Sequence, residues 1–205
     1  MDHFRTQYEK LYSGDEYYWG TEPADFLKKL IAIRKPDASV RVLDIGCGEG
    51  KDAVFMAEKG YSVTAFDITE SGIRKTKRLA AQRGVKVDAF VADINDFEID
   101  GAFDIIYSTG TIQYLREEEK DRFFEKIKNK TRPGGLNYFN VFVDKPFLAL
   151  PPDWDREEKM WKTGELFSHY ANWKIRRIDE RIFEDGSNGV PHYHCMDVIL
   201  AEKVM

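Results

Sequence analysis

The sequence predicts an α/β fold: a seven-stranded, mostly parallel sheet with helices on both faces, an antiparallel C-terminal hairpin and a helical N-terminal cover. Three observations predict it. From residue 40 onward, short apolar runs alternate with longer amphipathic segments, which is typical of a parallel sheet. A glycine-rich turn follows the first apolar run, as at the ligand-binding edge of such sheets. After residue 143 the rhythm changes, and two long runs joined by a short polar turn indicate a hairpin.

The first 36 residues are expected to form a helical N-terminal lid. Aromatic and aliphatic residues recur at helical spacing on either side of a break at residues 17–23, and Pro36 ends the segment before the first strand. Tyr18 and Trp19 lie in that break.

Residues 40–143 are expected to form the ligand-binding core. Ser71 can cap its second helix, and Gly84 ends that helix. The expected strands are 40–45, 62–66, 85–91, 103–107 and 136–143, and the expected helices are 52–59, 71–82 and 117–130.

Residues 144–205 are expected to add a substrate-side insertion and the hairpin. The stretch 145–161 contains three prolines and two tryptophans, and a short helix follows within 163–170. Strands 174–183 and 192–202 are joined by a turn over Glu184–Gly189, whose composition is typical of turns. We therefore predict one domain over residues 1–205.

Composition excludes several classes of protein. The net charge is −5 and charges of both signs are mixed along the chain, which argues against nucleic acid as a partner. The chain has neither a signal-peptide pattern nor an apolar run of membrane-spanning length, so no membrane partner is expected. Cys47 and Cys195 are too few for a disulfide framework. We expect a cytoplasmic protein that is a monomer or homodimer.

The most informative segment is Val42-Leu43-Asp44-Ile45-Gly46-Cys47-Gly48-Glu49-Gly50. Glycine lacks a Cβ, so the turn permits positive φ and lets a ligand approach the backbone. The NAD fingerprint has glycine at its first, third and sixth positions, whereas Lys51 occupies the sixth position here. The spacing favours a methyl donor over a dinucleotide.

Acidic residues end three successive strands. Asp44 ends the first, Asp67 the second, and Asp93 follows the third. The carboxyl ends of parallel strands meet at one edge of a sheet, so we expect these carboxylates to lie together there.

Together these features resemble the class I S-adenosylmethionine-dependent methyltransferases, whose motifs occur in order along most of the chain. More narrowly, the chain resembles the tellurite-resistance (TehB-like) group of small-molecule methyltransferases. The wider resemblance includes residues 42–50, 65–67, 91–93, 103–108 and 132–135, and the narrower one includes 46–52, 60–63 and 164–170. The resemblance implies S-adenosylmethionine as cofactor and a Rossmann-like sheet.

Roles for the cofactor residues follow from their expected positions. Asp44 faces the methionine amino group, Asp67 accepts from the ribose hydroxyls, and Asp93 accepts from the adenine amino group. Ile68 and Ile94 sandwich the adenine. The full expected set is Asp44, Gly46, Cys47, Gly48, Gly50, Asp67, Ile68, Asp93, Ile94, Ser108 and Trp19.

The acceptor site is expected near the lid and the last strands. Tyr18, Trp19, Tyr114 and Arg181 are its candidate substrate residues, and His192 and His194 are its candidate catalytic residues, as base or anion partner. His192 and His194 share a strand face, but no third ligand is evident and Cys195 points away, so no metal is expected.

We expect methyl transfer to a small molecule, with a metalloid oxyanion (tellurite or selenite) or a thiol as candidate acceptors. The loop Ser108-Thr109-Gly110-Thr111 contains neither the Asn/Asp-Pro-Pro-aromatic motif of amino-group methyltransferases nor a Pro-Cys nucleophile. A non-catalytic S-adenosylmethionine sensor or partner subunit is the alternative, because binding residues do not prove turnover.

Overall fold

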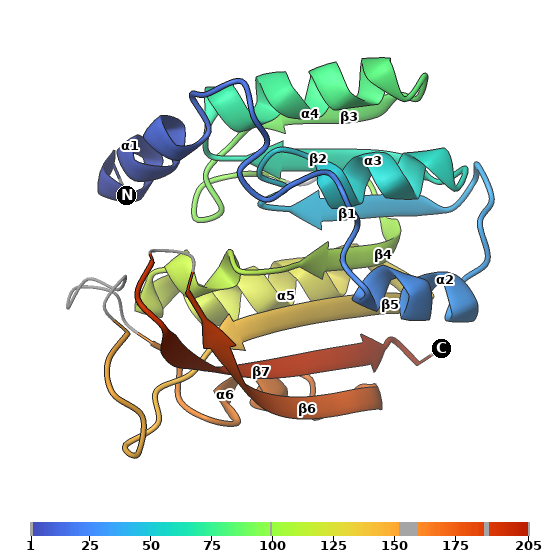
Figure 1. Ribbon diagram of the computed structural model, residues 1–205. Coiled ribbons are helices and arrows are strands. Elements are labelled where there is room, and N and C mark those ends of the chain that lie inside the picture. Colours follow the sequence, from blue (N-terminus) through green and yellow to red (C-terminus); the bar gives the residue numbers. More distant parts are fainter. Residues whose placement is uncertain (1, 99, 152–159, 187–188, 205) are drawn as a thin grey trace.

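The sheet is built from apolar strands whose connections return the chain to the same edge, so the first five strands run parallel (Figure 1). The computed structural model describes residues 2–98, 100–151, 160–186 and 189–204. Its strands are β1 Arg41–Ile45, β2 Ser62–Asp67, β3 Val87–Val91, β4 Phe103–Ser108, β5 Thr131–Phe142, β6 Lys174–Asp185 and β7 His192–Glu202. Their order is β3-β2-β1-β4-β5-β7-β6, with β7 antiparallel to both β5 and β6. The predicted fold class is confirmed.

Helices cover both faces of this sheet. They are α1 Asp2–Leu11, α2 Phe26–Ile33, α3 Lys51–Glu58, α4 Glu70–Gln82, α5 Lys120–Lys130 and α6 Glu165–Ser168, with short 3-10 turns at Ile112–Tyr114 and Glu117–Glu119. One apolar cluster joins α2, α3 and α4 to one face, and a second joins α5 and α6 to the other. Such two-sided burial explains why the central strands read as continuous apolar runs.

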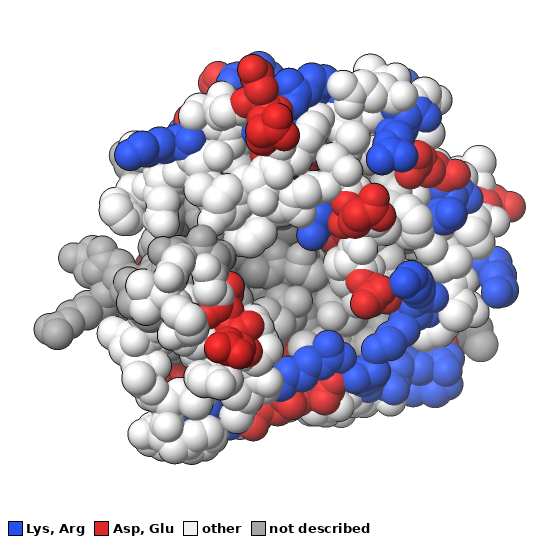
Figure 2. All heavy atoms as spheres, viewed as in Figure 1, with Lys and Arg blue, Asp and Glu red and all other residues white. Residues whose placement is uncertain are grey.

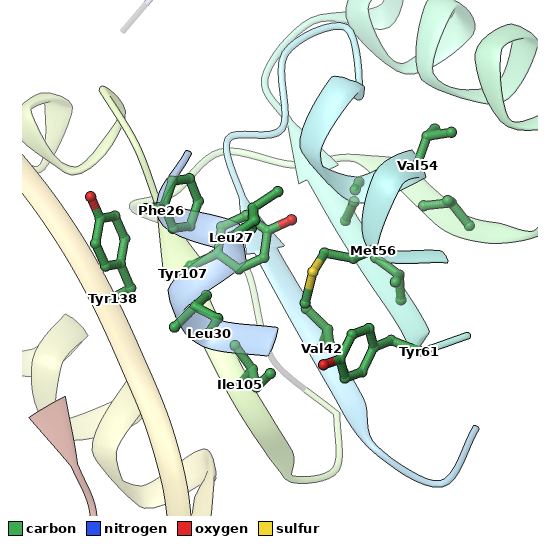
Figure 3. Packing of buried hydrophobic residues seen from close by; sticks show 14 of the residues in the cluster. Phe26, Leu27, Leu30, Val42, Val54, Met56, Tyr61, Ile105, Tyr107 and Tyr138 are labelled. Carbon is green, nitrogen blue, oxygen red and sulfur yellow. The ribbon is translucent and has the colours of Figure 1, made fainter. Parts of the chain in front are cut away.

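Helix α2 belongs to the core and not to a lid. Figure 3 shows Leu27 and Leu30 pointing onto the sheet beside Ile105, and both leucines are fully buried. Phe26 stacks on Tyr138 with ring centroids 4.2 Å apart. Within the predicted lid, it is α1 and the segment after it that lie beyond the carboxyl ends of β1 and β2 (Figure 1).

Several predicted boundaries were wrong, among them the starts of β3 and α5, which begin at Val87 and Lys120. The cap of α4 is Thr69, not Ser71, because Thr69 is extended and its side chain accepts from the Gly72 N–H at 3.1 Å. Ser71 lies in the first turn and bonds to Glu9 of α1. Strand β5 starts at Thr131, with a register shift opposite β4. Strand β6 continues to Asp185, which the sequence placed in the turn.

Part of the predicted insertion, residues 152–159, lies outside the described residues. Among the residues that are described, no helix is both long enough and apolar enough to cross a membrane.

Candidate cofactor and acceptor site

The glycine turn lies where the strand order reverses. The chain passes from β1 to β2 and β3 on one side of the sheet, then to β4 on the other side of β1. In open α/β sheets, ligands bind outside the carboxyl ends of the strands at such a point. Gly46, Gly48 and Gly50 have φ of 72°, 54° and 88°, all in the left-handed region that favours glycine.

Two of these glycines are also required by close packing. A Cβ on Gly46 would lie 2.1 Å from Thr111 Oγ1, and a Cβ on Gly50 would lie 2.5 Å from Thr76 Oγ1. Gly46 and Gly48 line the cavity described below, whereas Gly50 lies outside it and is the N-cap residue of α3. Gly50 therefore shapes the turn instead of contacting a ligand in the cavity.

A cavity of about 310 Å³ opens at this edge of the sheet. A smaller one of about 40 Å³ adjoins it, and the two share Tyr8, Gly46, Asp67, Ile68, Thr111 and Tyr114. The larger cavity is also lined by Tyr12, Trp19, Gly20, Asp44, Cys47, Gly48, Glu49, Lys51, Asp52, Thr109, Gly110, Gln113, Asn140, Phe142 and Met196. The two cavities therefore lie next to each other at the glycine turn.

Asp67 stands at the junction of the two cavities. Its Oδ2 accepts from the Gly48 N–H at 2.9 Å, and its Oδ1 accepts from Thr69 N and Oγ1 at 2.9 and 2.6 Å. A carboxylate offers about four acceptor positions, so these three donors leave room for a ligand hydroxyl. Burial raises the pKa of Asp67, while the three hydrogen bonds oppose that shift.

Asp44 lines the larger cavity from the end of β1. The Tyr107 hydroxyl donates to its Oδ2 at 3.0 Å. Burial, and secondly the negative charge of Asp52, raise the pKa of Asp44 well above its usual range. A cationic group in the cavity would favour the ionised form of this carboxyl.

The smaller cavity is apolar and suits a flat ring. Ile68 and Ile94 line it together with Phe66 and Ala92. Asp93 does not line either cavity; its Oδ1 accepts from Asn95 N and Nδ2 at 2.9 and 3.1 Å. Ile68 and Ile94 thus both line this cavity, while Asp93 bonds within its own loop.

Aromatic residues from the N-terminal segment close the larger cavity. Trp19 lines it, and the Trp19 Nε1–H donates to the Tyr12 hydroxyl at 3.0 Å. Tyr114 lines both cavities and shares a 2.8 Å hydrogen bond with the Tyr8 hydroxyl. Tyr18 packs on Trp19 outside the cavities and is 44% exposed.

Gln113 is a cavity residue that sequence reasoning missed. Its Oε1 is buried and has no hydrogen-bond partner among the described residues. A buried polar atom of this kind costs about 1–3 kcal/mol when it stays unsatisfied, so its position on the cavity wall fits a donor on a bound ligand. Tyr8, Tyr12, Thr111, Asn140 and Met196 were missed too.

Two further predicted residues lie away from the cavities. The Ser108 hydroxyl donates to the Ile45 carbonyl at 2.8 Å, joining β4 to β1. Arg181 is on the edge strand β6, where its Nε donates to Asp179 Oδ2 at 2.7 Å. Cys47 does line the larger cavity, and burial raises the pKa of its thiol.

A third cavity, of about 180 Å³, lies on the far side of Phe142. Phe142 lines both this cavity and the cofactor-side cavity. His194 lines the third cavity, and its ring centroid is 4.9 Å from that of Phe142. The other lining residues are mainly apolar but include two charged ones; they are Val143, Asp144, Lys145, Pro146, Leu148, Ala149, Leu150, Pro151, Met160, Tyr193 and Cys195.

Comparison with known proteins identifies the class. Residues 42–135 match a family model described as a methyltransferase domain. A 2-heptyl-1-hydroxyquinolin-4(1H)-one methyltransferase of Mycobacteroides abscessus is 34% identical over 170 residues, which are 80% of this chain and 72% of that protein. The probable S-adenosyl-L-methionine-dependent methyltransferase TehB of Haemophilus influenzae is 25% identical over 70% of this chain and 49% of its own length.

The fold agrees with these relatives. The crystal structure of TehB from Haemophilus influenzae superposes with a TM-score of 0.78 at 22% identity, covering 97% of this chain and 66% of that one. The chain spans about half the length of several curated relatives that it matches, TehB among them. This chain belongs to the class I S-adenosylmethionine-dependent methyltransferases, as the sequence predicted, with TehB-like proteins among its relatives.

The cofactor of this family is S-adenosylmethionine, and the residues present fit it. Gly46 and Gly48 line the larger cavity together with the carboxylates of Asp44 and Asp67, and Gln113 presents a carbonyl oxygen there that has no partner among the described residues. The smaller apolar cavity between Ile68 and Ile94 suits adenine.

Proposed function

We propose that this chain transfers the methyl group of S-adenosylmethionine to a hydroxyl or thiol of a small, largely apolar molecule. The observation that supports this best is that Phe142 lines both the cofactor-side cavity and the third cavity, whose lining is mainly apolar. Displacement at a sulfonium methyl depends mainly on holding the two reactants in line, so two adjoining cavities are the arrangement that it needs.

The relatives support an organic acceptor. The name of the Mycobacteroides abscessus relative gives a hydroxylated quinolinone as the molecule it methylates, and its identity to this chain is higher than that of TehB. The cavity beyond Phe142 has the apolar lining that such a ring would require.

The arginines of β6 do not favour an oxyanion acceptor. Arg177 and Arg181 pair with Asp179, and Arg176 pairs with Glu202. None of these arginines lines a described cavity. Tellurite and selenite, which the sequence suggested as acceptors, are therefore included in the test below as competing candidates.

The proposal also places His194 beside the acceptor, as a base or an anion partner. Acidic and basic side chains are interspersed on the face seen in Figure 2, which agrees with a small-molecule acceptor in place of a nucleic acid. We propose a cytoplasmic location and a monomer or homodimer, as the sequence suggested.

The test is incubation of the protein with S-adenosylmethionine and a panel of hydroxyquinolones, thiols, tellurite and selenite, with mass spectrometry of products. We expect S-adenosylhomocysteine and a methylated organic product, and His194→Ala is expected to lower turnover while cofactor affinity is kept. Turnover with the oxyanions alone would refute the acceptor class. Cofactor binding without any product across the panel would favour the sensor alternative.

A further inference from the structure

Three potential metal ligands meet at the turn end of the β6–β7 hairpin. Asp185 is the last residue of β6 and His192 is the first of β7, and the strand register pairs them directly. His194 lies two residues further along β7, so its side chain is on the same face as that of His192. Residues directly opposite in an antiparallel pair have Cβ atoms about 4.5–5.5 Å apart.

The distances fit a metal ion. His192 Nε2 is 2.9 Å from His194 Nε2, and His194 Nε2 is 3.6 Å from Asp185 Oδ2. The three ligand atoms all lie within 4.8 Å of one another. A tetrahedral Zn²⁺ with bonds of about 2.1 Å has ligand atoms about 3.4 Å apart. Coordination of one ion by all three requires small side-chain rotations and the loss of the hydrogen shared by the two Nε2 atoms, which form a hydrogen bond in the absence of an ion.

The tautomer of His192 is also suited to binding a metal. Its Nδ1 lies 2.7 Å from the Val190 carbonyl oxygen. Because a carbonyl oxygen can only accept, Nδ1 donates its hydrogen to Val190, and Nε2 is the nitrogen directed toward His194. A backbone carbonyl on the outer nitrogen is the partner that commonly orients a metal-ligating histidine.

The surroundings favour a defined site with an entrance. His192 and His194 are buried, and the rings of Phe142 and Phe183 pack against His194 with centroids 4.9 and 5.7 Å away. The side chain of Asp185 is 33% exposed, so an ion can enter from solvent on that side. An apolar shell around polar ligands limits water access and fixes their positions.

We propose that Asp185, His192 and His194 bind one divalent transition-metal ion, with Zn²⁺ as its representative. Two imidazoles and one carboxylate suit such ions, whereas Ca²⁺ and Mg²⁺ prefer oxygen ligands throughout. The sequence predicted no metal because no third ligand was evident; Asp185 was assigned to the turn, and its pairing with His192 supplies that ligand.

Three protein ligands leave at least one coordination position open. His194 lines the cavity beyond Phe142, so an oxygen or sulfur atom of an acceptor can complete the coordination. This positioning role depends on the proposed function and, when the ion is bound, it replaces the role of His194 as a base, because the ion then holds the lone pair of Nε2. Ion binding itself does not depend on the proposed function.

The experiment is titration of the metal-stripped full chain with Zn²⁺ in competition with a chromophoric chelator, supported by the visible absorption of bound Co²⁺. We expect one ion per chain. Asp185→Asn, His192→Gln and His194→Gln should each weaken Zn²⁺ binding by at least about 10–100-fold, since loss of even an outer partner has that effect. His3→Gln, on the exposed His3 outside the cluster, should bind as the wild type does.

Saturable binding that all three variants retain, or no binding by the wild type, would overturn the proposal. Unfolding temperatures of Asp185→Asn, measured with and without Zn²⁺, distinguish loss of the site from loss of the fold. Zn²⁺ should raise the unfolding temperature of the wild type but not that of this variant. Titration of the same samples with S-adenosylmethionine separates the two proposals. If the wild type does not bind S-adenosylmethionine, only the proposed function is contradicted.

Discussion

At the scale of single residues, the carboxylates of Asp67 and Asp44 have different roles in the site. Asp67 ties the glycine turn to the end of β2 through the Gly48 N–H and still borders both cavities. Asp44 is bonded to Tyr107 and has a raised pKa. Each role leads to a measurable consequence.

Asp67→Ala should weaken S-adenosylmethionine binding by about 1.5–3 kcal/mol, or about 10–150-fold, because a hydrogen bond to a charged group is lost. Isothermal titration calorimetry measures the change. An affinity equal to that of the wild type would refute the ribose role. Asp93→Ala is the comparison: Asp93 bonds within its loop, so a smaller effect is expected.

Asp44 should make cofactor binding pH-dependent. Its pKa in the free protein is raised by burial, and the cofactor's ammonium group favours the ionised carboxylate. Binding should therefore release a proton, and affinity should increase as pH rises through the raised pKa. Calorimetry in buffers of different ionisation enthalpy detects the proton, and Asp44→Asn should abolish its release. Proton release that persists in Asp44→Asn would contradict the assignment.

The raised pKa of Asp44 also makes the stability of the fold depend on pH, but stability changes with pH in the opposite direction to cofactor affinity. The unfolded chain ionises near the ordinary value of 3.8, whereas the folded chain holds the Asp44 proton to higher pH. The contribution of Asp44 to the stability of the free protein is therefore greatest at low pH and declines as pH rises through the window between the two pKa values.

At the scale of structural elements, the N-terminal segment is held over the cavity by a buried ion pair. Glu49 Oε1 lies 2.7 Å from Lys75 Nζ, and Glu49 Oε2 accepts from the Trp19 N–H at 3.1 Å. The side chains of Glu49 and Lys75 are only 2% and 7% exposed. The pair thus links α4, the glycine turn and the segment that carries Trp19.

Glu49→Gln should destabilise the protein by about 3–5 kcal/mol, because Lys75 would be left as an uncompensated buried charge. It should also weaken cofactor binding, because Trp19 would lose the carboxylate that fixes its backbone. Thermal unfolding and calorimetry check both effects. The exposed pair of Asp25 and Lys28 provides the control, and Asp25→Asn should change neither quantity. Wild-type behaviour of Glu49→Gln would contradict this account.

The glycine turn offers a second test at this scale. Gly46 and Gly84 both have left-handed φ, of 72° and 67°, but only Gly46 has a neighbour against its missing Cβ. Left-handed backbone costs a non-glycine residue about 1–2 kcal/mol, so Gly84→Ala should show that cost alone. Gly46→Ala should lose more, because its Cβ would overlap Thr111. Equal unfolding midpoints in denaturant would contradict the packing argument.

At the scale of the whole molecule, the strands and the residues at their carboxyl ends could be predicted from the sequence, because each depends on a local pattern of apolar residues. Asp44, Gly46 and Gly48 follow one apolar run, and Asp67 and Ile68 end the next, so strand alternation alone places them on one edge. The order of the strands and the two-sided apolar packing confirmed the predicted fold class.

The acceptor side could not be predicted in this way, because it depends on which distant strands become neighbours. Phe142 and Met196 meet only because β7 pairs with β5. Gln113 follows β4 in a 3-10 turn that has no distinctive sequence signal. Asp185 is followed by glycine and reads as part of a turn, and only the register opposite His192 reveals its place in β6.

The most direct measurement is calorimetric titration of the wild-type chain with S-adenosylmethionine and, separately, with NAD. We predict saturable binding of one S-adenosylmethionine per chain, which Asp67→Ala weakens or abolishes, and no comparable binding of NAD. Tight binding of NAD with no binding of S-adenosylmethionine would contradict it.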